Sequence, residues 1–251
     1  MLKRVIIFGA QSYVGLSLCE HLLKEGIEVK GVFFETRSSE EKDLVEERLM
    51  FIGRNALLEI NDTLYRQSEE DCRADLIIYC GEEDSAEDHV LLQESIEVAN
   101  NLNHSLLYIN SYNGETVDEI FFEILGNHSI LLLPQLIGPF QPQSNKTNQS
   151  IIRYLKNESK EILIENSILY VKDAIEATYH LLGNIESGMI YIFESEIINI
   201  EESNLPIKIR KQKNDGKKIQ KDIYTIKVES TISIEEGLNE QILYLKKMTE
   251  N

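Results

Sequence analysis

The sequence predicts an α/β protein whose parallel sheet is doubly wound, with helices on both of its faces. Short apolar runs alternate with helical patterns over the first 140 residues, and this alternation is typical of β–α–β units. The first apolar run, 4–9, leads straight through a glycine-containing turn into a helical pattern. After Pro142 the alternation becomes less regular. We therefore expect a first domain over 1–142 and a smaller C-terminal α/β lobe over 143–251, packed on the first and interleaved with it.

The expected strands of the first part are continuous in apolar residues, as strands buried on both faces should be. They lie at 4–9, 29–34, 56–60, 75–80, 106–110 and 129–133. Apolar residues at helical spacing predict helices at 13–24, 40–51, 90–102 and 117–125. In the second part the patterns predict helices at 147–156, 173–182 and 234–247, and strands at 161–164 and 189–193.

Composition argues against several classes of protein. The 251 residues include 43 acidic and 25 basic side chains, which gives a net charge of −18. This excess argues against a nucleic-acid face and against an anionic membrane surface, because both require Lys and Arg. No apolar run approaches the roughly 20 residues of a membrane span. The three cysteines and five histidines lack the spacing of disulfide or metal motifs. We therefore expect a cytoplasmic protein without a metal, a nucleic-acid partner or a membrane.

The turn GAQSYVG, from Gly9 to Gly15, joins the first strand to the first helix. In a dinucleotide-binding fold the first glycine of such a turn allows the tight bend, and the last allows close packing of helix on strand. The N-terminus of the following helix then meets the pyrophosphate with its unpaired N–H groups.

Five further segments follow the turn along the chain, DLIIYCG (75–81), LLYINS (106–111), LPQLIGP (133–139), YVKDAIEA (170–177) and ISIEEGL (232–238). Together with the turn they resemble, in the same order, segments of the extended short-chain dehydrogenase/reductase family, the NAD-dependent nucleotide-sugar epimerases and dehydratases. The turn resembles the GxxGxxG motif of that family. The others resemble its fourth and fifth strands, its "R-x-x-N-x-Y-G-P" segment, its "V-x-D-x-A-x-A" helix start and its closing helix. The resemblance implies a Rossmann-type fold, NAD or NADP as cofactor and a nucleotide or sugar-nucleotide ligand.

The resemblance also implies which residues contact the cofactor. Ser12 replaces the middle glycine of the family, so its hydroxyl either turns toward a phosphate or crowds the ligand. Glu35 stands 20 residues after Gly15 and could hold the ribose hydroxyls of NAD, whereas Arg37 could meet the 2′-phosphate of NADP. The full set of expected cofactor contacts is Gly9, Gln11, Ser12, Tyr13, Val14, Gly15, Glu35, Arg37, Cys80 and Gly81.

The catalytic pattern of the family is missing. Its chemistry uses a tyrosine and, four residues on, a lysine that lowers the pKa of the phenol. No YxxxK occurs in this sequence, and Glu115 and Glu119 stand at the expected positions. A carboxylate is already ionised at neutral pH and is a poor proton donor. The candidates for a displaced acid or base are Ser111 and Tyr112.

A basic segment interrupts the acidic chain at 208–221, which contains seven Lys and Arg residues and a single acidic residue, an Asp. Its Asn-Asp-Gly sequence predicts a turn at the tip of a hairpin. The family resemblance makes Arg210 and Lys211 candidates for binding the diphosphate of a sugar nucleotide. The alternatives are a solvated hairpin, or a surface for an acidic partner that could be a second copy of the chain.

Three functions follow from these observations. The first is a catalytically degenerate, NAD(P)-binding epimerase/dehydratase-like protein, a pseudoenzyme that acts as a sensor, regulator or partner subunit. The second is an active sugar-nucleotide epimerase, dehydratase or reductase with a displaced acid or base. The third is an interaction scaffold without a ligand, binding a protein partner or forming a homodimer.

Overall fold

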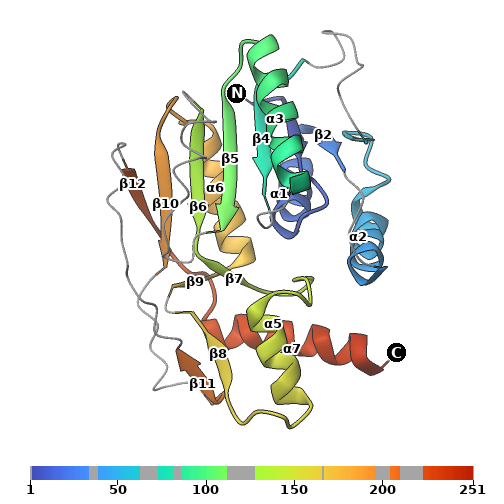
Figure 1. The fold of residues 1–251 in the computed structure, drawn as a ribbon, viewed down its shortest axis with the longest axis vertical. Helices are drawn as coiled ribbons and strands as arrows, with labels where there is room; N and C mark the ends of the chain where they lie inside the picture. The colour runs from blue at the N-terminus through green and yellow to red at the C-terminus, as the bar shows by residue number, and fades with distance from the viewer. Residues whose placement is uncertain are drawn as a thin grey trace.

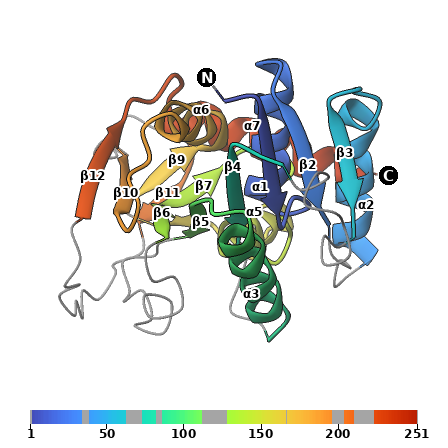
Figure 2. The ribbon, with the colours of Figure 1, turned by 90° about the horizontal axis from the view of Figure 1, so that it is seen from above.

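Parallel strands form one large sheet, whose strand order is β12-β10-β6-β5-β4-β1-β2-β3 (Figures 1 and 2). The computed structural model describes residues 2–33, 39–62, 73–81, 86–111, 128–165, 167–195, 204–209 and 223–250, and these contribute eight strands to the sheet. The order from β3 to β6 is that of a Rossmann-type sheet. The strands are β1 (Arg4–Phe8), β2 (Glu28–Val32), β3 (Leu58–Asn61), β4 (Leu76–Cys80), β5 (Leu106–Ser111), β6 (Ser129–Leu133), β10 (Ile190–Ser195) and β12 (Ile223–Val228).

Helices cover both faces of this sheet, which confirms the predicted fold class. Alternate residues of β1 point to opposite faces, as they must in a strand. Val5 and Ile7 pack in the cluster that includes helix α1 (Tyr13–Lys24), whereas Ile6 and Phe8 pack in the cluster that includes α3 (Ala86–Asn101). Figure 2 shows α3 on one side of the strands and α1 with α6 (Val171–Leu182) on the other. Helix α2 (Ser39–Ile52) joins the α1 side through Val45.

The chain after β6 builds a smaller group of elements below the sheet and then returns to it (Figure 1). Two short parallel pairs form there, β7 with β9 and β8 with β11, while β10, β12 and α6 belong to the layers of the large sheet. The boundary at residue 142 stays a prediction. The further elements are β7 (Gln135–Ile137), α5 (Lys146–Leu155), β8 (Ile162–Ile164), β9 (Ile168–Tyr170), β11 (Ile207–Ile209) and α7 (Ile234–Glu250).

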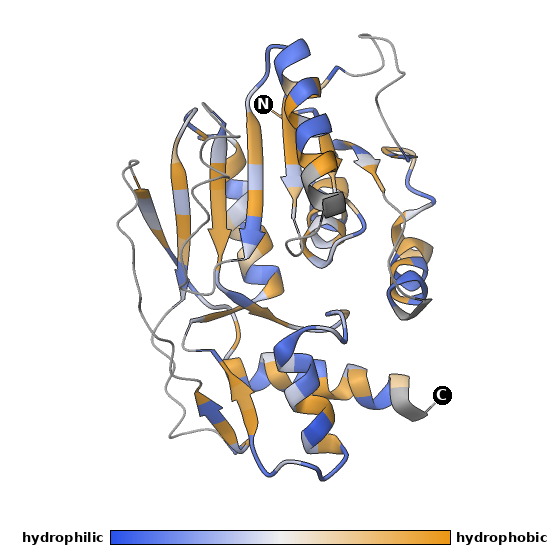
Figure 3. Ribbon diagram, in the orientation of Figure 1, coloured by the Kyte–Doolittle hydropathy of each residue, from blue (hydrophilic) through white to orange (hydrophobic). Residues whose placement is uncertain are grey.

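Most predicted elements have counterparts within a few residues, and the ranges of α1 and β6 agree with the prediction. The largest shift is in α3, which begins at Ala86 rather than at 90. The strands β7, β9, β11 and β12 were not predicted. The central strands were easier to predict because they are largely hydrophobic along their length, as Figure 3 shows. The predicted helix 117–125 lies outside the described residues, as do Glu35, Arg37, Tyr112, Glu115, Glu119, Arg210 and Lys211.

The predicted hairpin around the basic segment is not formed by the strands that flank it. β11 pairs in parallel with β8, whereas β12 pairs in parallel with β10 at the edge of the large sheet. The two flanking strands therefore belong to different sheets, while the hairpin predicted around Asn-Asp-Gly falls outside the described residues and stays a prediction. Residues 210–222 themselves lie outside the described residues.

Three buried amide side chains fasten the loop after β7 to α5 and α7. The Nε2 of Gln241 donates to Oε1 of Gln141 at 2.6 Å and to Oδ1 of Asn148 at 2.5 Å. Its Oε1 accepts from the backbone N–H of Gly138 at 3.1 Å. All three amide residues are buried. Because buried polar groups cost free energy unless they are paired, this network holds the loop in one position.

Across the part of the chain that the structure describes, none of the helices combines the length and the apolar character needed to cross a membrane.

Candidate functional site

Close backbone contacts fix the glycine turn between β1 and α1. Gly9 has φ of +68°, and a Cβ atom on it would lie 2.2 Å from the carbonyl oxygen of Cys80. A Cβ atom on Gly15 would lie 2.3 Å from the carbonyl oxygen of Gly9. Both distances are far shorter than any van der Waals contact. Only glycine fits these two positions, as the sequence pattern indicates.

Ser12 caps α1 with its side chain. Its Oγ accepts a hydrogen bond from the N–H of Gly15 at 2.9 Å, and its side chain is 1% exposed. An N-cap serine satisfies one of the N–H groups that have no partner within the helix. The Ser12 oxygen thus serves as the cap of α1.

A cleft of about 220 Å³ opens at the carboxyl ends of the strands, beside this turn. One wall comes from the turn and from the ends of β4, β5 and β6, and the other comes from β7 and the loop that follows it. In open α/β sheets, ligands bind at this edge. The lining residues are Ser12, Tyr13, Val14, Glu41, Gly81, Ile109, Asn110, Ser111, Leu133, Pro134, Gln135, Leu136, Gln141, Pro142, Ser144 and Asn145.

Polar side chains in the cleft are held by hydrogen bonds within the protein. Asn110 accepts from the N–H of Ser111 at 2.8 Å and donates to the hydroxyl of Tyr108 at 2.8 Å. Gln135 accepts from the N–H of Glu165 at 2.8 Å. Asn145 caps α5 by accepting from the N–H of Thr147 at 2.8 Å. These side chains are therefore fixed before any ligand arrives.

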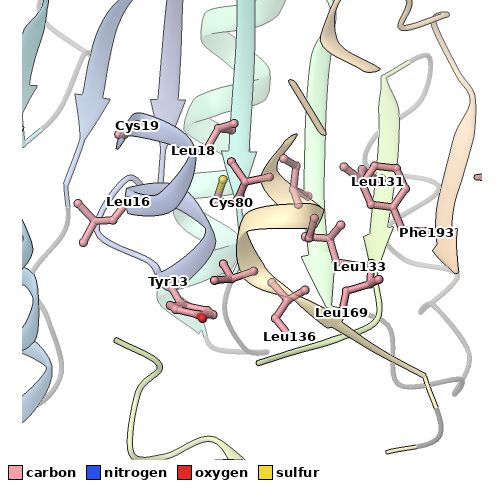
Figure 4. Packing of buried hydrophobic residues seen from close by; sticks show 14 of the residues in the cluster. Tyr13, Leu16, Leu18, Cys19, Cys80, Leu131, Leu133, Leu136, Leu169 and Phe193 are labelled. Atoms are coloured by element: carbon pink, nitrogen blue, oxygen red, sulfur yellow. The ribbon is translucent and has the colours of Figure 1, made fainter. Parts of the chain in front are cut away.

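Tyr13 connects the glycine turn to the opposite wall. Its side chain is 8% exposed, and burial raises its pKa although Arg48 lies close enough to oppose the shift. A Cβ atom on Gly138 would lie 3.1 Å from the Tyr13 hydroxyl oxygen. Figure 4 shows the ring at the start of α1, beyond the strand ends and on the side where Leu136 lies. Burial therefore favours the neutral form of the Tyr13 phenol.

Two of the sequence motifs serve to position α7. The carboxylate of Asp173, from the segment YVKDAIEA, accepts from the backbone N–H of Thr231 at 3.0 Å and from its hydroxyl at 2.5 Å. Ser233 and Glu236, from ISIEEGL, exchange hydrogen bonds of 2.8 Å and 3.2 Å in a capping box. These interactions lower the pKa of Glu236. The motifs thus fix where α7 begins.

The structure brings several predicted residues together along the cleft, namely Ser12, Tyr13, Val14, Gly81 and Ser111. The predicted contacts Gly9, Gln11, Gly15 and Cys80 belong to the turn and to the end of β4 and are not among the residues that line the cleft.

Sequence reasoning missed Glu41, Asn110, Gln135, Gln141 and Asn145. Gln135 lies inside the segment LPQLIGP and Asn110 inside LLYINS, so proximity to a motif was the available signal for these two. Among the described residues, no group of three or more His, Cys, Asp or Glu side chains is arranged to hold a metal ion.

We predict that Gly15→Ala destabilises the protein by about 1–3 kcal/mol, because the added methyl group must displace backbone. Gly183→Ala is the matched control, since Gly183 has φ of −76° and nothing lies within 4 Å of its Cβ position. The control should be neutral or slightly stabilising. Thermal unfolding followed by circular dichroism measures both, and equal melting temperatures for Gly15→Ala and wild type would contradict the described turn.

No protein-family model matches the chain. A relative in Bacillus subtilis (strain 168), the uncharacterized protein YjaV, is 26% identical over 166 residues, which cover 63% of this chain and 80% of its own.

Several solved structures share the fold over nearly the whole chain. UDP-glucuronic acid 4-epimerase from Bacillus cereus, in complex with NAD, has a TM-score of 0.69 at 13% identity and covers 98% of this chain and 99% of its own. The dTDP-glucose 4,6-dehydratase from Bacillus anthracis str. Ames, also with NAD, has a TM-score of 0.66 at 13% identity. The match covers 99% of this chain and 98% of the dehydratase. UDP-glucose 4-epimerase from Thermotoga maritima, with UDP-glucose, has a TM-score of 0.62 at 16% identity. The match covers 98% of this chain and 99% of the epimerase. At these identities the likeness is one of fold: the chain has the Rossmann-type fold that is also found in NAD-dependent epimerases and dehydratases of sugar nucleotides.

Proposed function

We propose that the cleft binds an NAD-type dinucleotide together with a nucleotide or sugar-nucleotide ligand. We further propose that the protein works without hydride transfer, as a sensor, regulator or partner subunit. The observation that carries this proposal is the glycine turn, which presents the N-terminus of α1 to a cleft at the carboxyl edge of the sheet. A dinucleotide pyrophosphate needs N–H donors and a positive helix end in this place.

The residues present at the turn suit such a ligand. The first turn of α1 contains no acidic residue. The partial positive charge of the helix end is therefore not neutralised by a carboxylate of that turn and stays available to a ligand anion. The Ser12 side chain is directed at the N–H of Gly15, so the altered middle position of the turn leaves the approach to the helix open. The enclosed volume of about 220 Å³ is smaller than the roughly 300–1,000 Å³ of most ligand sites. A bound dinucleotide therefore extends through the open side of the cleft.

The opposite wall suits the hydroxyl groups of a sugar. Its polar lining residues are amides and a hydroxyl, namely Gln135, Gln141, Ser144 and Asn145. Such groups recognise hydroxyls by direct or water-mediated hydrogen bonds. The neighbouring structures support this assignment, since they include UDP-glucuronic acid with NAD in the Bacillus cereus epimerase and UDP-glucose in the Thermotoga maritima epimerase.

The proposed loss of catalysis rests on the titratable groups of the site. Among the described residues that line the cleft, these are Glu41 and Tyr13, and burial keeps the phenol of Tyr13 protonated. Together with the absence of YxxxK from the whole sequence, this leaves no phenol paired with a lysine among the described lining residues. Ser111 does line the cleft, which is the observation that favours the second candidate, an enzyme with a displaced acid or base.

We predict that NAD binds more tightly than NADP. Glu41 is the charged residue among the described lining residues, and its carboxylate repels the additional 2′-phosphate of NADP. Glu41→Gln should reduce the preference by about three- to tenfold, because a charge interaction at such a site is worth about 1 kcal/mol. Glu46→Gln is the control, on an exposed position of the same helix.

Isothermal titration of wild type and both variants with NAD and NADP measures this preference. Tighter binding of NADP by wild type, or a preference that Glu41→Gln leaves unchanged, would refute the electrostatic assignment.

We also predict that the protein, incubated with NAD and UDP-glucose, UDP-glucuronic acid or dTDP-glucose, neither epimerises the sugar nor accumulates reduced nicotinamide. Chromatography of the sugar nucleotides and the absorbance of reduced nicotinamide provide the two measurements. Turnover that falls at least about tenfold in Ser111→Ala but not in Ser144→Ala, on the opposite wall, would establish the second candidate instead.

A further inference from the structure

Arg48 is a buried cation on α2 that lies outside the cleft lining. Its side chain is 2% exposed. The Nε and Nη2 atoms donate to Oε1 of Glu20 on α1 at 3.0 Å and 2.9 Å. A charge buried to this degree is tolerated only with such a partner and further hydrogen bonds. The pair therefore neutralises the charge, but it leaves donors of the guanidinium free for other contacts.

Those donors reach the first turn of α1. The Nη1 atom donates to the carbonyl oxygen of Tyr13 at 3.2 Å, and Nη2 donates to Oγ of Ser17 at 3.0 Å. Ser17 in turn donates to the same Tyr13 carbonyl at 2.7 Å. Tyr13 is the first residue of α1 and a lining residue of the cleft. The guanidinium thus holds the N-terminus of α1 in place from behind the cleft.

The same guanidinium also contacts the opposite wall. Its central carbon lies 5.5 Å from the centre of the Phe140 ring, within the range of a cation–π interaction. Phe140 has φ of +65° and precedes Gln141, which lines the cleft. The Phe140 ring also lies 4.7 Å from the ring of Tyr244 on α7.

We infer that Arg48 is a positioning residue that couples the two walls of the cleft. It sets the N–H groups of the first turn of α1 for the pyrophosphate of the ligand, and it links that turn to the loop at Phe140. This inference rests on the proposed dinucleotide binding. It assigns to Arg48 an effect on ligands that contain a pyrophosphate and none on the adenosine part.

Arg48→Lys separates this role from the ion pair. Lysine keeps the charge next to Glu20, but its single ammonium cannot make the contacts that the planar guanidinium makes to Tyr13, Ser17 and Phe140 together. We expect the affinity for NAD and for ADP to fall about tenfold, the equivalent of one hydrogen bond to a charged group, while the affinity for adenosine is unchanged. Arg153→Lys, at an exposed position of α5, is the matched control and should bind all three ligands as wild type does.

A single tryptophan tests the coupling by a separate signal. The chain contains no tryptophan, so Phe140→Trp introduces one reporter beside Arg48, and tryptophan is the ring that best binds a cation. We expect binding of NAD to change the fluorescence emission of this tryptophan. Arg48→Met or Arg48→Lys in the Phe140→Trp background should remove at least half of that change. Circular dichroism verifies that each variant is folded. If Arg48→Met does not fold, the result for Arg48→Lys decides the test by itself.

The outcomes separate failure of the inference from failure of the proposed function. Wild-type binding of NAD with unaltered affinity for NAD and ADP in Arg48→Lys would overturn the positioning role alone. An equal loss of affinity for adenosine would assign Arg48 a general structural role, which also overturns the inference. If wild-type protein binds neither NAD nor NADP, the proposed function fails, and the positioning role fails with it.

Discussion

The close approach of backbone to backbone at the glycine turn is the constraint on which the rest of the structure depends. Gly9 lies against the carbonyl of Cys80 at the end of β4, and Gly15 lies against the carbonyl of Gly9. These contacts place the start of α1 directly at the carboxyl ends of β1 and β4. The buried residues Leu16 and Cys19 can then pack on one face of the sheet, while the helix N-terminus borders the cleft. A side chain at either glycine would collide with these carbonyls, so the backbone of the turn would have to shift.

Polar groups buried around the cleft fix its second wall. The amides of Gln141, Asn148 and Gln241 bind one another and the N–H of Gly138. Arg48 binds α1 and contacts Phe140. Each of these groups is costly to bury without its partners, so the partners specify one arrangement of turn, loop and α7. This wall of the cleft, as far as the structure describes it, is consequently held in one arrangement by contacts within the protein.

Where local pattern and tertiary role coincide, the sequence predicted the structure closely. The path from β1 through the turn into α1 carries three such signals, a buried strand, required glycines and a helical period. The limits of α1 were predicted correctly, and β1 ends one residue before the predicted end. The strands β7, β9 and β11 have three residues each, too few to show a period. β12 lies at the sheet edge with exposed Ile223 and Tyr224, so its pattern does not resemble a buried strand. Its partner, β10, is set by tertiary folding, which is why β12 was not predicted.

The candidate site was predictable to the extent that it belongs to motifs. Ser12, Tyr13, Val14, Gly81 and Ser111 follow strands whose ends meet at one edge, so their meeting could be foreseen. In contrast, Gln141 reaches the cleft through the fold of its loop. Arg48 lies in the sequence EEKDLVEERL, where it is indistinguishable from the solvated charges of an amphipathic helix. Only the packing of α2 against α1 reveals that it is 2% exposed.

The most direct test of the account is a crystal structure of the protein grown with NAD. The account predicts electron density for the dinucleotide in the cleft, with its pyrophosphate within hydrogen-bond distance of the first N–H groups of α1, next to Tyr13 and Val14. NAD bound at any other place, or a cleft without NAD at a concentration that saturates the protein in solution, would contradict the central claim.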